Sequence, residues 1–510
     1  MWRIIALVIV FELAYCKGDD ALYDPPGGKG FWAQKITPGS TVFEFYRVAA
    51  MYVAGSKNTS IYLDTAPRPN GLPDVDQASI DRLLTVFENQ IIPIEHTWYT
   101  APLDVNQDGK VLLLLLDIQD GYRVGSASGY VGGYFFGLNQ YSENSVNTYN
   151  SNYHSNYAEM LYLDTYPSDY NSTGFYATAA HEYQHLLQFS KSYREGIALE
   201  PAWIDEGLAE ISSDLTGFGP QYSRASYFTY SLLNSTSLLN FQSVNGSSLL
   251  DNYSMVYMYF RYLADVYGLG GISTIFNESR LGYDGINQSL AVLDPTLTGV
   301  SNCGSTTGLT NLFFQCSYRY FWATLVNTLG ATISGTKVLF NNSTVNTLTP
   351  PSNIYLFNTS NTAYRDTVIA ALNSGNYGTP LSPGVGGTPT GSLPSFGVKL
   401  FQSVVTGPPD PAPTLTSCNG CGLTMVAGSK YLAVYNHDLA STATHFANVA
   451  DSRLVASMNA DSTVLIDQLP TLSGSATRQL HARFEIAEPF HAHLRKHATE
   501  DRKKAQLKRE

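Results

Sequence analysis

The sequence has few cysteines, few charged residues and no long hydrophobic run beyond its first sixteen residues. Five of its 510 residues are cysteine, and Asp, Glu, Lys and Arg together make up 14%. A net charge of −12 argues against a general nucleic-acid binder, because such a protein presents a basic face to phosphates. No later stretch reaches the ~20 apolar residues that a membrane-spanning helix requires. We therefore expect no nucleic-acid partner and no transmembrane segment.

The first sixteen residues predict an export signal. Arg3 supplies a positive charge, and Ile4–Phe11 form an apolar core too short to span a bilayer. Ala14-Tyr15-Cys16 fits a signal-peptidase site. Leu13–Cys16 also fits a bacterial lipobox, except for the tyrosine before the cysteine, so Cys16 is a candidate for lipidation. We expect a secreted, extracellular protein, with a cell-surface lipoprotein anchored through Cys16 as the alternative.

The other four cysteines predict disulfides, because an exported chain with an even number of cysteines usually pairs them. The simplest pairs close two short loops, Cys303 with Cys316 and Cys418 with Cys421. The CNGC spacing of the second pair also occurs in redox and metal half-sites. No partner cysteines or thioredoxin-like context accompany it, which favours a small disulfide loop.

The length and the aromatic content predict several packed domains. Hydrophobic residues make up 44% of the chain, including 24 Phe and 35 Tyr, and 510 residues suggest two to four domains. Composition divides the chain into a signal peptide (1–16), an N-terminal β-rich segment (17–75), a main domain (76–378), a Gly/Pro/Ser/Thr linker (379–395), a small β-sandwich-type domain (396–487) and a basic tail (488–510).

Hydrophobic periodicity predicts an α+β main domain. Alternation between Phe31 and Asp64 predicts two or three antiparallel strands, and spacing of three and four predicts a helix over 76–93. Further strands are expected at 111–118, 130–137 and 158–164, with a functional or mobile loop at 138–157. A long helix over 252–268 is expected to end at Gly268.

The segment before strand 111–118 matches the first half of a calcium-binding loop at Asp104, Asn106 and Asp108. Leu115 stands where an EF-hand has its bidentate glutamate, so the match is partial. A carboxylate from elsewhere, such as Asp117 or Asp120, could complete a calcium site. The alternative is a tight Asp-Gly turn that leads into the strand.

The most informative stretch is His181-Glu182-Tyr183-Gln184-His185, within a predicted helix that begins near Ser172 or Thr173. Histidines four residues apart lie on one helical face, where both can bind one metal ion. The intervening Glu182 projects beside that face and can take a proton from a metal-bound water.

A second stretch, WIDEGLAE, predicts another helix with Pro201 suited to its first turn. A catalytic zinc site needs a third protein ligand and leaves one position for water. Glu206 is the candidate third ligand. Glu210 lies one turn further on and is a candidate to accept a hydrogen bond from the far ring nitrogen of His181.

HEYQH followed by WIDEGLAE resembles the gluzincin metallopeptidases, and AHEYQHLLQF with WIDEGLAE is most similar to the hyicolysin family of secreted bacterial peptidases. The resemblance covers roughly residues 80–270, and it is strong at these two motifs and loose elsewhere. It implies a thermolysin-like fold, in which a mixed sheet is followed by a helical subdomain.

The resemblance also implies roles for two other segments. Gly133, Tyr134 and Phe135 resemble the edge strand that receives the substrate backbone. Tyr253 resembles the tyrosine that the aminopeptidase branch directs at the oxyanion, and packing is the alternative role. Ser254 departs from the Glu-Lys-Gly sequence of that branch, which weakens the second match.

These patterns together predict a zinc endopeptidase with one zinc ion per chain, a possible calcium ion, a monomeric state and protein or peptide substrates. Zinc would be held by His181, His185 and Glu206, with Glu182 as the general base. One alternative is an aminopeptidase-like hydrolase, although no acidic anchor for a free N-terminus is evident. The other is a non-catalytic adhesion protein on a vestigial metallopeptidase fold.

Overall fold

The computed structural model describes residues 27–36, 44–68, 75–122, 130–233, 236–239, 241 and 246–298, most of 313–322, and short strands up to residue 481. The chain divides into two compact units. The first contains residues 1–96, 100–196 and 477–510, and the second contains residues 97–99 and 197–476.

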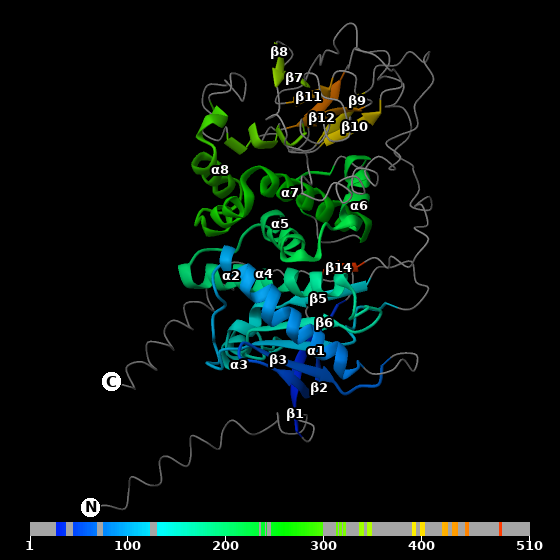
Figure 1. Ribbon diagram of the computed structural model, residues 1–510, viewed down its shortest axis with the longest axis vertical. Coiled ribbons are helices and arrows are strands. Elements are labelled where there is room, and N and C mark those ends of the chain that lie inside the picture. The colour runs from blue at the N-terminus through cyan, green and yellow to red at the C-terminus, as the bar shows by residue number, and fades with distance from the viewer. Residues whose placement is uncertain are drawn as a thin grey trace, which may run out of the picture. The chain divides into compact units, whose positions relative to one another are not determined.

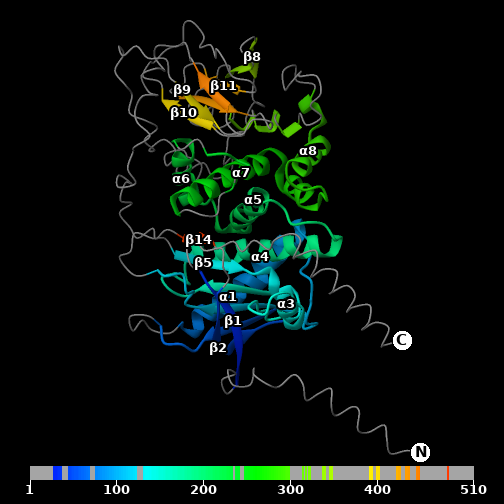
Figure 2. The ribbon, with the colours of Figure 1, turned by 180° about the vertical axis from the view of Figure 1, so that it is seen from behind.

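The first unit is built on a mixed sheet in the order β1-β2-β3-β4-β6-β5-β14 (Figure 1). The strands β1 (Gly28–Lys35), β2 (Glu44–Gly55) and β3 (Thr59–Asp64) are antiparallel, as their alternating pattern predicts, and Figure 2 shows β1 and β2 from behind. Next come β4 (Val111–Leu116) and β6 (Met160–Asp164), which continue in parallel from β3. The strand β5 (Tyr130–Phe135) is antiparallel to β6.

The centre of this sheet is apolar because its strands are covered on both faces. Every residue of β4, with the sequence VLLLLL, is buried, as expected for a central strand with parallel neighbours. The three strands predicted around 111–164 are all present, although each is shorter at one end than its hydrophobic run. Their pairing joins the N-terminal β-rich segment to the main domain in one sheet.

Two helical segments pack on this sheet. The helix α1 (Gln77–Val86) continues through a π-helical turn, η3 (Phe87–Ile91), into α2 (Ile92–Trp98), which extends the helix predicted at 76–93. α1 contacts β2 and β3, while α4 (Thr173–Glu195) contacts β5, β6 and η3. α4 begins as predicted, because the Ser172 hydroxyl accepts a hydrogen bond from the Phe175 amide.

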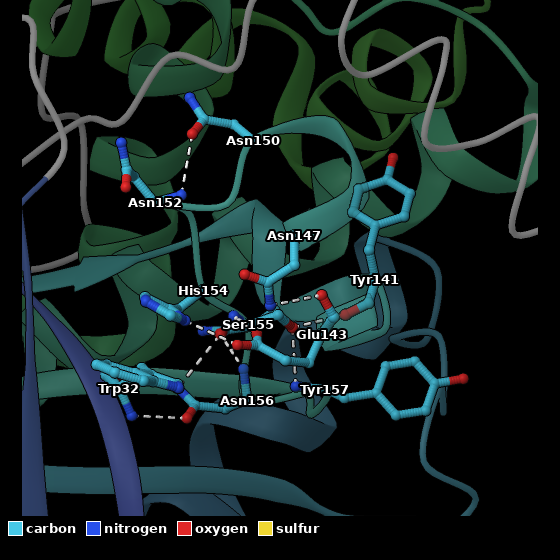
Figure 3. Close-up of polar contacts among 11 residues, drawn as sticks. Trp32, Tyr141, Glu143, Asn147, Asn150, Asn152, His154, Ser155, Asn156 and Tyr157 are labelled. Carbon is cyan, nitrogen blue, oxygen red and sulfur yellow. Dashed lines mark hydrogen bonds and ion pairs between the residues drawn. The ribbon is translucent and has the colours of Figure 1, made fainter. Parts of the chain in front are cut away.

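The segment predicted as the 138–157 loop is an ordered polar network (Figure 3). It contains a short 3-10 helix, η4 (Gly137–Gln140), and the helix α3 (Glu143–Tyr149). Glu143 accepts hydrogen bonds from the His154 ring and the Ser155 amide. Asn156 bonds both backbone groups of Trp32 in β1, on whose ring His154 stacks at 3.6 Å. This network positions the segment that leads into β6.

The second unit contains helices α5 (Ala202–Ser213), α6 (Tyr222–Leu233), α7 (Gly246–Asn277) and α8 (Gly282–Leu293), with shorter turns η5 (Asp214–Phe218) and η6 (Pro295–Thr298). α5 and α6 pack against α7. A side chain at Gly207 would meet the Phe260 ring at 2.3 Å, so the glycine permits the close approach of α5 to α7. The helix predicted to end at Gly268 does end there, because this glycine has a non-helical backbone at φ 66° and ψ −170°, and a second helical segment follows it within α7.

The strands between residues 336 and 447 form two small antiparallel groups in the second unit. One has the order β10-β12-β11-β7-β8, from β7 (Thr336–Phe340), β8 (Thr344–Leu348), β10 (Val398–Gln402), β11 (Cys421–Val426) and β12 (Tyr431–Asn436). The other pairs β9 (Thr390–Leu393), at the end of the predicted linker, with β13 (Thr444–Ala447). A sandwich of these sheets stays a prediction.

Several predictions concern residues outside the described part of the chain. They include the export signal with Cys16 and the basic tail. Cys316 is buried and disulfide-bonded, but the side chains of the other three cysteines are not described, so both pairings stay predictions. None of the described helices has the length and apolar character needed to cross a membrane.

Candidate metal centre

The helix α4 directs two imidazoles toward one point. His181 and His185 are one turn apart, and their Nε2 atoms lie 3.1 Å from each other. Two nitrogens bound tetrahedrally to zinc at 2.0–2.1 Å would lie about 3.3 Å apart, so the observed spacing suits ligands of one ion. The His181 ring is fully buried and the His185 ring is partly buried.

Glu206 supplies a carboxylate to the same group. One ligand atom from each of His181, His185 and Glu206 lies within 4.8 Å of the other two. Two imidazole nitrogens and one carboxylate oxygen match the ligands of a catalytic zinc site that keeps a position for water. The residues present therefore fit zinc, as the sequence predicts.

Glu182 is fully buried and lies on α4 beside β5. A Cβ placed on Gly133 of β5 would lie 3.2 Å from Glu182 Cγ and 2.7 Å from Thr178 Cγ2. The absence of a side chain at Gly133 therefore sets how closely the strand approaches the candidate general base. This contact gives Gly133 a role beyond its backbone pairing.

We expect Gly133→Ala to lower peptide hydrolysis by roughly 10²-fold, because the new methyl group displaces Thr178 and Glu182 from their positions. Overpacking should also lower the free energy of unfolding by about 1–3 kcal/mol. Steady-state kinetics and thermal unfolding measure the two effects. Gly270→Ala is the control, because a Cβ there has open space, and an equal loss in both variants would contradict the steric account.

Glu210 is held by Arg224 of α6. Two guanidinium nitrogens of Arg224 donate to Glu210 Oε1 at 2.9 and 2.6 Å, and both side chains are buried. Burial disfavours the charged guanidinium, but the Glu210 carboxylate and, more weakly, Tyr253 and Glu206 raise the pKa of Arg224 overall. The predicted hydrogen bond from His181 to Glu210 stays a prediction, and Arg224 is a residue that sequence patterns did not indicate.

Tyr253 lies within α7 rather than at its start, and it is fully buried. The Arg224 guanidinium lies 4.8 Å from the centre of its ring, and the Phe241 ring meets it edge-on at 5.1 Å. Arg224 therefore links the candidate oxyanion residue to Glu210. Packing and catalysis are both compatible with these contacts.

The residues predicted to receive substrate alternate between the two faces of β5. The Tyr134 ring is fully buried and stacks on Tyr162 at 4.1 Å, whereas the Phe135 ring meets Phe189 of α4. The expected free edge is occupied by β14 (Gln479–His481), which pairs in parallel with β5 and places His481 opposite Gly133. These three residues lie within the predicted C-terminal β domain, yet they join the first sheet.

Glu95 of α2 is a second residue that no motif indicated. It is fully buried, and neither of its carboxylate oxygens accepts a hydrogen bond from the described residues. Burial raises the pKa of Glu95 well above its ordinary value, while the charge of His185 opposes that rise. The proximity of Glu95 to His185 depends on the packing of α2 against α4, which no local sequence pattern shows.

The mixed sheet, the helices and the His-His-Glu group define a metalloprotease-like domain with a candidate zinc site. The chain is distantly homologous to the neutral metalloprotease ShpI of Staphylococcus hyicus, with 30% identity over 233 residues. The match covers 43% of this chain and 48% of the relative, so the chain spans about half the length of the curated relative it matches. No family model matches the chain.

Proposed function

We propose that the protein is a secreted or surface zinc-dependent endopeptidase. The observation that carries this proposal is the meeting of His181, His185 and Glu206 within 4.8 Å, with Glu182 between the two histidines in sequence. The distant homology to a neutral metalloprotease supports peptide bonds as the substrate class. Bound by these residues, zinc would polarise the scissile carbonyl and lower the pKa of its water toward ~7.

Glu182 acts as the general base in this proposal. Its carboxylate takes a proton from the attacking water and passes it to the nitrogen of the leaving amine. The side chain is buried between α4 and β5, where little bulk water competes for that proton. The backbone of β5 aligns an extended peptide by main-chain pairing, which requires β14 to leave its place beside Tyr130–Gly133.

Tyr253→Phe separates the catalytic role of this tyrosine from packing. If the phenol donates a hydrogen bond to the developing oxyanion, we expect kcat to fall roughly 10²-fold while KM changes little. The ring contacts with Arg224 and Phe241 are retained in phenylalanine, so the packing of the ring should be preserved. An unaltered kcat would assign Tyr253 to packing alone. Steady-state kinetics with a quenched internal peptide measures both constants.

Endopeptidase and aminopeptidase activity are separated by the choice of substrate. A blocked internal peptide should be cleaved and an amino-acid p-nitroanilide should not, because no described feature marks an anchor for a free N-terminus. Secretion, with or without lipidation of Cys16, is tested by mass spectrometry of the N-terminus of the exported protein. A hydrolysis pattern confined to free amino termini would replace endopeptidase with aminopeptidase.

A further inference from the structure

The loop from Asp104 to Gly109, here called the 104–109 loop, lies where two parallel strands begin. It precedes β4, and Glu159 immediately precedes β6. β4 and β6 pair in parallel with Leu112 opposite Met160, and the Leu112 amide donates to the Glu159 carbonyl at 2.7 Å. The starts of parallel strands share one edge of a sheet, so pairing brings this glutamate to the loop.

The Glu159 side chain points into the start of the loop. Its Oε1 accepts hydrogen bonds from the amides of Asp104 and Val105 at 3.1 and 2.8 Å. The residue is 1% exposed, and no described residue donates a hydrogen bond to its Oε2. A buried carboxylate oxygen without a donor is costly, and a bound cation would remove that cost.

The loop carries further oxygen atoms, near the Glu159 carboxylate, that could serve as metal ligands. Burial raises the pKa of Glu159 to about 7, and the nearby Asp104 and Asp108 carboxylates add to the rise. Asp104 Oδ1 accepts from the Gly109 amide at 3.0 Å, which wraps the loop around its own side chains. Lys110 does not neutralise the group, because its ammonium donates to the Ser56 carbonyl.

We propose that the 104–109 loop binds a calcium ion and that a residue distant in sequence completes its coordination, the ligands being Asp104, Asn106, Asp108 and Glu159. Hard oxygen ligands of this kind select calcium or magnesium over zinc, and calcium tolerates irregular ligand geometry better than magnesium does. Among the described residues, His181, His185 and Glu206 form the one group of three such side chains already close enough to share an ion, so calcium binding would have to draw the loop carboxylates toward Glu159.

The same topology excludes the carboxylates that the sequence suggested for completing the site. Asp117 and Asp120 follow the carboxyl end of β4, six strand residues beyond the loop. At about 3.3 Å per residue, that separation is about 20 Å. Asp120 instead accepts hydrogen bonds from the Tyr122 and Val131 amides.

The test is calorimetric titration of calcium chloride into the zinc-loaded full chain after dialysis against calcium-free buffer. We expect one calcium per chain, and at 100 times Kd a rise in Tm of about 5 °C. Glu159→Gln should weaken calcium binding at least ~10-fold, while Asp117→Asn should leave it unchanged. Magnesium chloride should bind more weakly.

A second variant separates a loss of calcium binding from a failure to fold. Asp108 is exposed, and Asp108→Asn keeps an oxygen for the Lys110 amide, so this protein should fold and still lose calcium affinity at least ~10-fold. Absence of calcium binding to the parent chain would overturn the proposal. Calcium affinity that survives both Glu159→Gln and Asp108→Asn would overturn it equally, as would a loss confined to Asp117→Asn.

Discussion

Glu182→Gln is expected to retain zinc and to lose peptide hydrolysis by roughly 10²- to 10⁴-fold, the range that a general base contributes. Glutamine keeps the shape of the side chain beside Gly133 but cannot accept the proton of the attacking water. The fold and the His181–His185 spacing should therefore be preserved. Zinc content by atomic absorption and cleavage of a quenched internal peptide measure the two properties on the same sample.

The matched control for this variant is Glu195→Gln, at the end of the same helix. Glu195 lies about 20 Å along α4 from Glu182, so the same chemical change there should leave kcat within about twofold. If Glu182→Gln cleaves as fast as the parent protein, Glu182 is not the base. If it loses zinc as well as activity, the loss reflects metal binding rather than proton transfer.

Glu206→Gln is expected to reduce zinc from about one ion per chain to well below half, and activity with it. The carboxylate is the only negative ligand of the predicted three, and a neutral amide binds zinc far more weakly. Treatment of the parent protein with 1,10-phenanthroline should give the same loss, and added zinc should restore only the parent. Metal analysis after dialysis is the direct measurement.

The control for the ligand variant is Glu278→Gln, a partly exposed glutamate immediately after α7. It should bind zinc and cleave peptide like the parent chain. Thermal unfolding distinguishes ligand loss from misfolding, because Glu206→Gln should unfold cooperatively, at the temperature of the metal-free parent. Full zinc content in Glu206→Gln, or undiminished proteolysis by metal-free protein, would contradict the assignment of the centre.

Local sequence patterns predicted the elements that carry the site. The period of the helix places His181 and His185 on one face whatever the rest of the chain does, and the Ser172 cap defines where that helix begins. The run of leucines in β4 and the alternation of β1 to β3 are equally local signals. Each depends on residues a few positions apart, which interact in any context.

Local sequence patterns could not predict contacts between residues that are distant in the sequence. The sequence placed Gly133 in the substrate strand but not against Glu182, because that contact requires α4 to pack on β5, and Glu159 has no link to the 104–109 loop until β4 and β6 pair. The importance of Arg224 becomes evident only from its hydrogen bond to Glu210, and that of Glu95 only from its interaction with His185. The occupation of the β5 edge by Gln479–His481 could not be inferred from strand propensity at all.

The sequence by itself determined the candidate metal-binding helix, the identity of the candidate base and the α+β character of the chain, because the helical period of about 3.6 residues and the strand period of two follow from local backbone geometry. Only the tertiary structure decided which side chains surround those groups. Packing of helices on a sheet and the register of parallel strands join residues that are dozens of positions apart, and nothing in the local pattern records that pairing.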